Sequence, residues 1–518
     1  MSVRTLRRIS QWAIFLVFVF LFLNTEYKDN DVLPYAVNIF LRLDPLVAAA
    51  AAVSGRALIS LVWPALIVAG LTVLLGRFFC GWACPMGSLL DAVDATVFAG
   101  LRSRGAVPPP FWRRWKYLIL VFLAGSALFT LQWVFFFDPI SILIRTFAVS
   151  VFPALNRIVH DAFGALYQAH PGAAAIVSEP VYGFLKAHFL AFEQPVFRTA
   201  APVGLFFLAI LAAEYYQRRF WCRNLCPLGA LLGLLGRFGL FRRRVMEDGC
   251  TRCDLCEKSC RMGAIHDDVE TFHGECVGCM DCQVICPEEV IRFSGKEGRR
   301  EAAVDLTRRG LMTSAALGAF TVPFFRVEAR RKAPDPGLIR PPGALSEDGF
   351  LARCTRCGEC MRVCIANGLQ PTWFEAGLEG MWSPVLVPRI GYCEFNCTLC
   401  GQVCPTGAIR RLPLADKKKV VIGLAEVDRS RCLPWRGQSD CIVCEEHCPT
   451  AQKAILMKEE KGMTITGEVR VFKRPYIDER LCIGCGICET KCPLTDRGAV
   501  YVTSRGESRA VSGDPIAS

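Results

Sequence analysis

The sequence predicts an α-helical membrane domain with four transmembrane helices and a fifth further along the chain, joined to α+β ferredoxin-like domains that bind 4Fe-4S clusters. Three observations predict this fold class. Long apolar runs crowd the first half of the chain, basic residues gather at the ends of these runs, and the 28 cysteines fall into regularly spaced groups. Hydrophobic residues make up 52% of the chain, which is high for an ordinary soluble protein.

Four apolar runs approach the length of about 20 residues that a helix needs to cross a bilayer. They lie at residues 9–23, 58–76, 117–137 and 200–216. Arginines and lysines precede the first and third runs and follow the fourth. The positive-inside rule therefore places these ends in the cytoplasm of a bacterial-type inner membrane. The segments 26–44 and 138–198 carry mixed charge and are expected to be loops on the outer side.

The formal net charge of +12 follows from this topology. Nucleic-acid binding would also explain a basic chain, but the basic residues cluster at the ends of apolar runs and no nucleic-acid reader motif accompanies them. We therefore expect membrane lipid as a partner, and no nucleic acid.

Twenty-four of the cysteines form six groups of four. A 4Fe-4S cluster needs four thiolates; a C-x2-C-x2-C loop supplies three, and the trailing cysteine, often followed by proline, binds the neighbouring cluster. The first two groups are Cys250, Cys253, Cys256, Cys260 and Cys276, Cys279, Cys282, Cys286. This rule assigns Cys286 to the cluster of Cys250, and Cys260 to the cluster of Cys276.

Four more groups follow in the C-terminal region. They are Cys354, Cys357, Cys360, Cys364; Cys393, Cys397, Cys400, Cys404; Cys432, Cys441, Cys444, Cys448; and Cys482, Cys485, Cys488, Cys492. The outer two groups have the tight spacing, and the middle two are stretched. This order resembles the four-cluster subunits of molybdopterin oxidoreductases. The resemblance favours a nested pairing, first group with last and second with third, over a sequential one.

Disulfides and zinc ribbons are the alternative uses of these cysteines. The repeated x2 spacings place most partners too close in sequence to form disulfides, and the chain is far larger than disulfide-stapled scaffolds. Zinc ribbons use C-x2-C pairs without the trailing Cys-Pro. Six 4Fe-4S clusters are therefore the expected cofactors.

The remaining four cysteines belong to an internal repeat in the membrane half. Each copy has an Asp-Pro at its outer end, Asp44-Pro45 or Asp138-Pro139, and ends in a Cys-x3-Cys-Pro-x-Gly motif, FFCGWACPMG or FWCRNLCPLG. An axis along the membrane normal would bring the two cysteine pairs together as one metal site. A redox-active dithiol and simple packing remain open as alternatives. The four cysteines are Cys80, Cys84, Cys222 and Cys226.

These signals divide the chain into four parts. A membrane domain with two Cys-x3-Cys-Pro repeats spans residues 1–240, and a two-cluster ferredoxin spans 241–298. Residues 299–330 contain TRRGLM before an apolar stretch, which looks like a twin-arginine signal and predicts a fifth transmembrane helix. The four-cluster domain at 331–518 would then be periplasmic; if the stretch is only a linker, that domain stays in the cytoplasm.

On these motifs, residues 1 to about 295 resemble NapH and its relatives NosR and CcoG, polytopic membrane proteins with paired Cys-x3-Cys-Pro motifs and a two-cluster ferredoxin. Residues from about 300 to 518 resemble the ferredoxin-type NapG and MauM proteins. The resemblance implies quinol oxidation or electron relay toward a periplasmic reductase or dehydrogenase.

Three functional classes remain after this reading. The first is an electron-transfer subunit that links the quinol/quinone pool to a catalytic oxidoreductase or cytochrome subunit, and it is the preferred one. The second is a maturation or reactivation factor that reduces a metal centre in another protein, and the third is a passive anchor. No catalytic residue is assigned, because no nucleophile and base pair stands out. Quinol oxidation releases protons, for which the candidate acceptors are Asp44, Asp138, His188 and Glu193.

Overall fold

The computed structural model describes residues 2–27, 31–33, 35–98, 110–169, 173–191, 193–246, 249–265, 270–295, 306–331 and 335–509. The beginning of the expected segment 299–330 and the last nine residues of the expected four-cluster domain lie outside this description. The chain forms two compact units. Unit 1 contains residues 1–24, 37–146 and 202–324, and unit 2 contains residues 25–36, 147–201 and 325–518.

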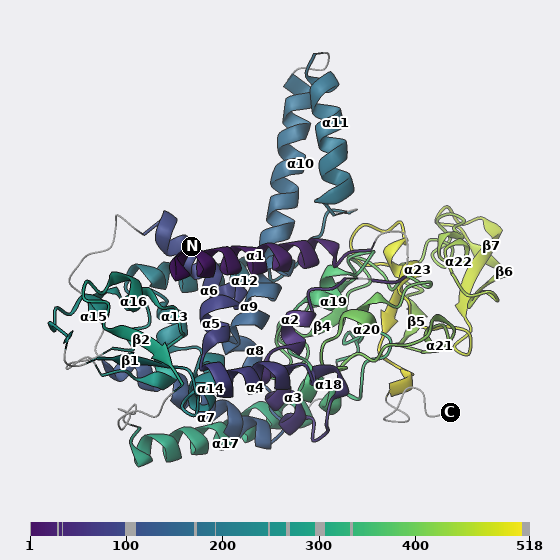
Figure 1. Cartoon of the computed structure of the whole chain (residues 1–518). Coiled ribbons are helices and arrows are strands. Elements are labelled where there is room, and N and C mark those ends of the chain that lie inside the picture. The colour runs from purple at the N-terminus through teal and green to yellow at the C-terminus, as the bar shows by residue number, and fades with distance from the viewer. Residues whose placement is uncertain are drawn as a thin grey trace. The chain divides into compact units, whose positions relative to one another are not determined.

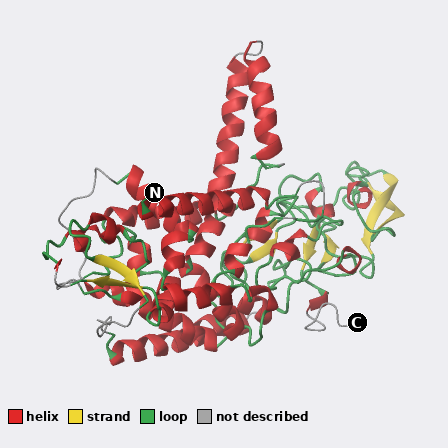
Figure 2. Cartoon of the chain, in the orientation of Figure 1, coloured by secondary structure: helices red, strands yellow, loops and turns green. Residues whose placement is uncertain are grey.

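Unit 1 consists mainly of helices (Figure 2). They are α1 (Val3–Asn24), α2 (Ile39–Arg42), α3 (Pro45–Ser54), α4 (Ala65–Leu75), α5 (Phe78–Trp82), α6 (Pro85–Thr96), α7 (Arg114–Leu128), α8 (Val134–Phe137), α9 (Pro139–Thr146), α12 (Ala200–Ala212), α13 (Phe220–Asn224) and α14 (Pro227–Gly236).

The internal repeat organises the packing of these helices. In each copy a proline occupies the first turn of the helix that follows the outer aspartate, α3 or α9, and of the helix that follows the cysteine pair, α6 or α14. Helix α14 of the second copy packs against α3 and α4 of the first, while α6 of the first copy packs against α9 of the second. Each copy thus packs the helix that follows its cysteine pair against helices of the other copy.

Two helices among the described residues are long and apolar enough to cross a membrane, Val3–Asn24 and Pro139–Gln168. The first matches the expected run at 9–23. The runs at 58–76 and 200–216 form the shorter apolar helices Ser60–Leu75 and Ala200–Tyr215. The run at 117–137 is interrupted, because α7 ends at Leu128 and α8 begins only at Val134.

The expectation of an outer loop at 138–198 is wrong. The segment contains the helix Pro139–Gln168, whose last part is α10 (Phe152–Ala169), and a second helix, α11 (Ala173–His188), which lies beside α10 (Figure 1). The charges that suggested a loop lie one helical turn apart: Arg157 pairs with Asp161 at 3.6 Å. Such spacing places them on one face of a helix.

The first ferredoxin region is part of unit 1. Strand β1 (Arg242–Val245) pairs antiparallel with β2 (Ile291–Ser294), and the short helices α15 (Leu255–Ser259) and α16 (Asp281–Ile285) pack against each other between them in sequence. This is the α+β arrangement expected for a two-cluster ferredoxin.

Helix α17 (Arg308–Arg331) covers the expected twin-arginine stretch and is continuous, but it is not one of the two candidate spans. It approaches α7 through small residues. A side chain on Gly318 would collide with the carbonyl of Phe122, and one on Gly125 would lie 3.0 Å from the carbonyl oxygen of Ala315. Close approach through glycine and alanine is the usual packing of membrane helices.

Unit 2 carries short strands and helices around the C-terminal cysteines. Its strand pairs, all antiparallel, are β3 (Leu369–Pro371) with β4 (Pro384–Leu386), β5 (Leu424–Val427) with β8 (Val500–Thr503), and β6 (Ile455–Met463) with β7 (Val469–Ile477). Its helices after α17 are α18 (Glu347–Arg353), α19 (Glu359–Arg362), α20 (Leu399–Val403), α21 (Leu414–Lys417), α22 (Val443–Glu446) and α23 (Ile487–Thr490).

Candidate iron-sulfur sites

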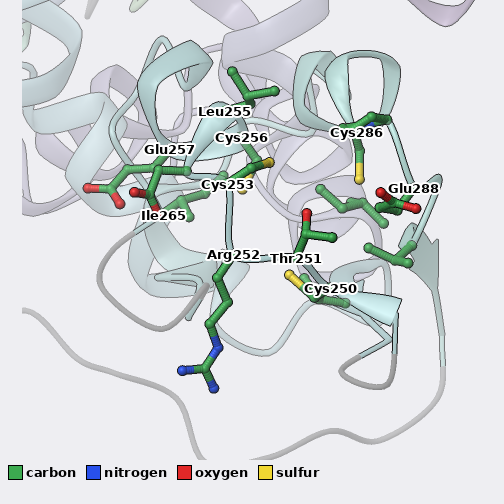
Figure 3. A pocket seen from close by; sticks show the side chains of 15 residues that line it. Cys250, Thr251, Arg252, Cys253, Leu255, Cys256, Glu257, Ile265, Cys286 and Glu288 are labelled. Atoms are coloured by element: carbon green, nitrogen blue, oxygen red, sulfur yellow. The ribbon is translucent and has the colours of Figure 1, made fainter.

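The cysteines of the first ferredoxin form two separate ligand sets. Cys250, Cys253, Cys256 and Cys286 line one pocket (Figure 3). A second pocket is lined by Cys260, Cys276, Cys279 and Cys282. The trailing cysteine of each group therefore joins the other group's loop, as the crossing rule predicts.

The four C-x2-C-x2-C loops share a backbone feature that suits binding of an iron-sulfur cluster. In each loop the residues on both sides of the second cysteine have positive φ. These residues are Arg252 (50°) and Asp254 (56°), Gly278 (59°) and Met280 (56°), Arg356 (48°) and Gly358 (86°), and Gly484 (73°) and Gly486 (83°). Left-handed residues between right-handed ones turn successive N–H groups into a concave nest, which is a known setting of Fe–S sites. Four of the eight are not glycine, so the surrounding loop holds them in a strained conformation.

In unit 2 the pairing is sequential, and the nested pairing is wrong. The thiol of Cys360 interacts electrostatically with those of Cys357, Cys354 and Cys404. The same kind of interaction among the other thiols defines four ligand sets, and the cysteines of set B also line one pocket. They are set A (Cys354, Cys357, Cys360, Cys404), set B (Cys364, Cys393, Cys397, Cys400), set C (Cys448, Cys482, Cys485, Cys488) and set D (Cys432, Cys441, Cys444, Cys492).

Two hairpins explain this pairing. The strands β3 and β4 lie between the first and second cysteine groups, and β6 and β7 lie between the third and fourth. Because an antiparallel hairpin returns the chain to its starting point, each hairpin brings consecutive groups together. Accordingly α19 packs against α20, and α22 packs against α23.

The four sets of unit 2 form a linear series. Sets A and B exchange trailing cysteines, as do sets C and D. The backbone N–H of Cys393 in set B donates to the carbonyl of Cys485 in set C at 2.8 Å. The order is therefore A, B, C, D, with A and D at the two ends.

Burial raises the pKa of several of these thiols. Burial and then the neighbouring thiols of Cys432 and Cys441 raise the pKa of Cys444 to about 12. Since iron binds thiolates, its binding must displace these protons. The sets therefore have the chemistry of metal ligands, which ionise on binding, and not of reactive free thiolates.

The two membrane cysteine pairs converge. Cys80 and Cys222 lie in α5 and α13, and Cys84 and Cys226 precede α6 and α14. Cys84 interacts electrostatically with Cys80 and Cys222, and Cys226 with all three of the others. The sulfur of Cys226 also accepts the N–H of Gly229 at 3.2 Å. A helix N-terminus with a free N–H favours a thiolate, so four thiolates can meet here.

Two arginines that the sequence analysis missed enclose the converging pairs. Arg77 and Arg219 are both 1% exposed, and each lies three residues before the first cysteine of its pair. The guanidinium of Arg219 donates to the carbonyls of Cys80 and Gly87 at 2.8 and 3.2 Å, and to Asp91 at 2.8 Å. Arg77 donates to Glu275 at 3.0 Å. The repeated Arg-x2-Cys-x3-Cys-Pro-x-Gly pattern was the available signal.

The glycine of each motif makes room for the arginine of the other copy. A side chain on Gly87 would lie 3.2 Å from the Arg219 guanidinium, and one on Gly229 would lie 2.7 Å from that of Arg77. Each arginine therefore reaches from its own repeat to the helix that follows the other cysteine pair. Two positive charges beside four thiols are what a negatively charged cluster needs in a buried site.

The first ferredoxin lies directly against this site. The indole N–H of Trp82 donates to the carbonyl of Gly278 at 3.0 Å, and Gly81 leaves no space for a side chain against the carbonyl of Val277. Arg7 of α1 donates to the carbonyl of Cys279 at 2.7 Å. The loop that carries Cys276 and Cys279 thus packs on the helix that carries Cys80.

Within the described residues, no group of three or more His, Cys, Asp or Glu side chains is arranged to hold a single metal ion. A cubane cluster spreads its four thiolates more widely than one ion does.

The structure brings two of the four proton-acceptor candidates together. Asp44 and Asp138 are both fully buried, and their carboxyl groups lie close enough to interact electrostatically. One oxygen of Asp44 accepts the N–H of Leu46 at 2.7 Å, and one oxygen of Asp138 accepts the N–H of Ser141 at 2.7 Å. The other two candidates, His188 and Glu193, lie in unit 2 and are exposed.

Two family models match the chain, both described as a 4Fe-4S binding domain. The first matches residues 57–104 and 199–245, which contain the two membrane cysteine pairs. The second matches residues 475–494, which contain the last cysteine group. No solved structure matches the chain.

Three relatives represent the similarity to known proteins. Regulatory protein NosR of Stutzerimonas stutzeri is 27% identical over 43% of this chain and 26% of its own length. Methylamine utilization ferredoxin-type protein MauM of Methylorubrum extorquens is 41% identical over 21% of this chain and 50% of its own length. YccM of Escherichia coli K12, whose name assigns it provisionally to electron transport, is 26% identical over 48% of this chain and 59% of its own length.

The chain is a NosR- and NapH-like iron-sulfur protein with a ferredoxin region. It spans less than two thirds of the length of each of these three relatives. The similarity of the chain to these relatives and family models supports iron-sulfur electron transfer as its general function.

Proposed function

We propose that this NosR- and NapH-like protein is a membrane-bound electron-transfer subunit that links the quinol/quinone pool to a catalytic oxidoreductase or cytochrome subunit. It does so through six 4Fe-4S clusters and a seventh held by Cys80, Cys84, Cys222 and Cys226. The observation that carries the proposal is the convergence of these four thiols directly beside the first ferredoxin. A 4Fe-4S cluster at each ligand set would supply one-electron transfer.

The protein's own residues supply the setting for that transfer. Arg77 and Arg219 place positive charge beside the membrane site and exclude water from it, since both are buried. Glu275 joins Arg77 to Lys116 of α7 and thereby ties the first ferredoxin to the helix bundle. The backbone nests of the tight loops present N–H groups to sulfur.

The buried pair Asp44 and Asp138 is the proposed proton acceptor for quinol oxidation. One quinol gives up two electrons and two protons; clusters at the ligand sets would take the electrons one at a time. Two adjacent carboxylates in a protein interior are not both charged, so the pair is a place where a released proton is held. Each carboxylate uses one oxygen to cap a helix and keeps the other for this role.

Replacing both Asp44 and Asp138 with asparagine tests this function. Asparagine keeps the helix caps but cannot take up a proton. We expect reduction of the clusters by a short-chain ubiquinol or menaquinol to slow by about 10²-fold or more, measured by stopped-flow bleaching of the visible absorbance. Reduction by dithionite, which needs no proton acceptor, should be unchanged.

Asp161→Asn is the matched control, because this exposed aspartate lies in the same half of the chain. If the double variant oxidises quinol at the wild-type rate, the carboxylate pair is not the acceptor. If no quinol reduces the wild-type clusters, the link to the quinol pool is wrong.

A second test addresses localisation. We expect a reporter fused after the last residue to be periplasmic, one fused near Ser294 to be cytoplasmic, and Arg308→Lys with Arg309→Lys to keep the C-terminal domain inside, as a twin-arginine signal requires. If both reporters are cytoplasmic in the unmutated protein, α17 does not cross the membrane. The four-cluster domain would then serve a cytoplasmic partner.

A maturation or reactivation factor is the second candidate function, favoured by the similarity to Regulatory protein NosR. In that case the electrons reduce a metal centre in another protein. A molybdopterin or multihaem subunit that co-purifies under anaerobic conditions would support the electron-transfer subunit, whereas a copper enzyme would support the maturation factor.

A further inference from the structure

The two ends of the series A to D differ in their surroundings. All four cysteines of set A are buried. Arg362, two residues beyond Cys360, donates to Glu26 at 2.9 Å and stacks on Phe152 at 3.8 Å. Glu26 and Phe152 belong to segments that continue directly into unit 1 along the chain. The A end is thus covered by other segments of unit 2.

At the D end the long insertion between Cys432 and Cys441 forms a cover. The backbone N–H of Trp435 donates to the thiolate of Cys432, and the indole N–H donates to the carbonyl of Pro475 in β7 at 3.4 Å. Cys441 and Cys492 are only partly buried. The eight inserted residues, 433–440, therefore connect Trp435 to Cys432 of set D through its backbone and to β7 through its indole.

Cationic side chains surround that indole. The guanidinium groups of Arg429 and Arg474 lie 4.3 and 4.8 Å from the centre of the Trp435 ring, and Lys458 lies 4.6 Å from the ring of Tyr476. The two rings meet edge to face at 5.4 Å. We name these five residues the basic-aromatic face.

The face keeps a net positive charge. Its acidic neighbour Glu460 pairs with Arg474 at 3.1 Å and accepts the hydroxyl of Tyr476 at 2.6 Å. In the part of the chain that the structure describes, Arg429 and Lys458 are exposed and form no ion pair with a carboxylate. Arg431, adjacent to Cys432 in sequence, pairs with the exposed Asp496 at 3.7 Å and donates to the carbonyl of Arg497.

We infer that the basic-aromatic face is where a redox partner with an acidic surface docks and exchanges electrons with set D. The inference rests on the proposed electron-transfer function and adds the site and charge of the partner. Complementary charge steers such encounters and raises their rate at low salt. Trp435 provides a flat contact surface three residues from Cys432, to which its backbone N–H donates.

Charge reversal at Arg429 and Lys458 tests the inference. The probe is an acidic plant-type 2Fe-2S ferredoxin, and its binding to the full-length protein is measured by titration calorimetry at low and high salt. We expect Arg429→Glu with Lys458→Glu to weaken binding about tenfold or more at low salt, and the difference to vanish at high salt because exposed charges are then screened.

A kinetic readout accompanies binding. Dithionite-reduced protein is mixed with ferricyanide, whose iron(III) takes one electron from a reduced cluster and becomes iron(II), or with basic cytochrome c. The variant should react more slowly with ferricyanide and faster with cytochrome c. Lys419→Glu, an exposed lysine near set B, is the control, with iron content measured for every variant.

The outcomes separate this inference from the proposed function. If the double variant binds and reacts like the wild type at every salt concentration, or if Lys419→Glu has an equal effect, the face is not the docking site. If the wild-type clusters do not accept electrons from quinol, the proposed link to the quinol pool is wrong. The docking site would still be tested independently by the calorimetry.

Discussion

Cys404→Ala is expected to remove the cluster of set A and to leave set B, nearer in sequence, intact. The variant should lose about four irons per chain. The reason is the β3–β4 hairpin, which brings Cys404 to Cys354, Cys357 and Cys360. Anaerobic iron analysis with quantitative EPR of the reduced protein measures the loss.

Double variants make the test independent of spectral assignment. If Cys357 and Cys404 bind one cluster, Cys357→Ala with Cys404→Ala loses no more iron than either single variant, about four. Cys441→Ala with Cys404→Ala should lose about twice as much, because set D is separate. The nested pairing predicts the reverse pattern, in which Cys404 and Cys441 share a cluster, so one pair of iron measurements decides between them.

Arg219→Met is expected to destabilise unit 1 by about 3–5 kcal/mol, the usual consequence of removing one partner of a buried ion pair. Burial alone would raise the pKa of Asp91, but Arg219 and Arg261 lower it below its ordinary value, so the carboxylate stays charged. Methionine fills the space but removes one of the two arginines that pair with Asp91, and it leaves the carbonyls of Cys80 and Gly87 without the Arg219 donor.

Arg218→Met is the matched control for this variant. Arg218 is the adjacent arginine, its side chain is 53% exposed, and it pairs with Asp94 at 3.1 Å. Exposed pairs contribute about 0–1 kcal/mol, so its effect should be small. Thermal unfolding of both variants in detergent, followed by circular dichroism, provides the comparison. Equal midpoints for the two variants would show that Arg219 is not a structural partner of the cysteine repeats.

Local sequence was sufficient where the structure depends on spacing along the chain. The C-x2-C-x2-C loops predicted the tight cluster loops and the crossing of Cys260 and Cys286, because a cluster takes three ligands from one short loop. The apolar run at 9–23 predicted α1. The repeated Cys-x3-Cys-Pro-x-Gly motif predicted that the two pairs could meet, since identical motifs at the same point of two repeats occupy equivalent places about one axis.

Other features depend on contacts between distant segments, which spacing does not encode. The pairing of the C-terminal groups follows from two hairpins that the cysteine pattern does not reveal. The helix at 139–168 was hidden because its mixed charge predicted a loop, whereas Arg157 and Asp161 pair one helical turn apart. Arg77 and Arg219 looked like ordinary basic residues at the ends of apolar runs, and only the exchange of helices between repeats turns them toward the opposite cysteine pair.

The sequence by itself determined which residues can bind clusters, because ligand chemistry is a property of residue type and short spacing. Only the tertiary structure decided which of them bind together, which charges surround them, and that Asp44 and Asp138 share one buried site. These are non-local contacts, and their partners are chosen by packing of the whole unit, where a buried charge is stable only beside its complement.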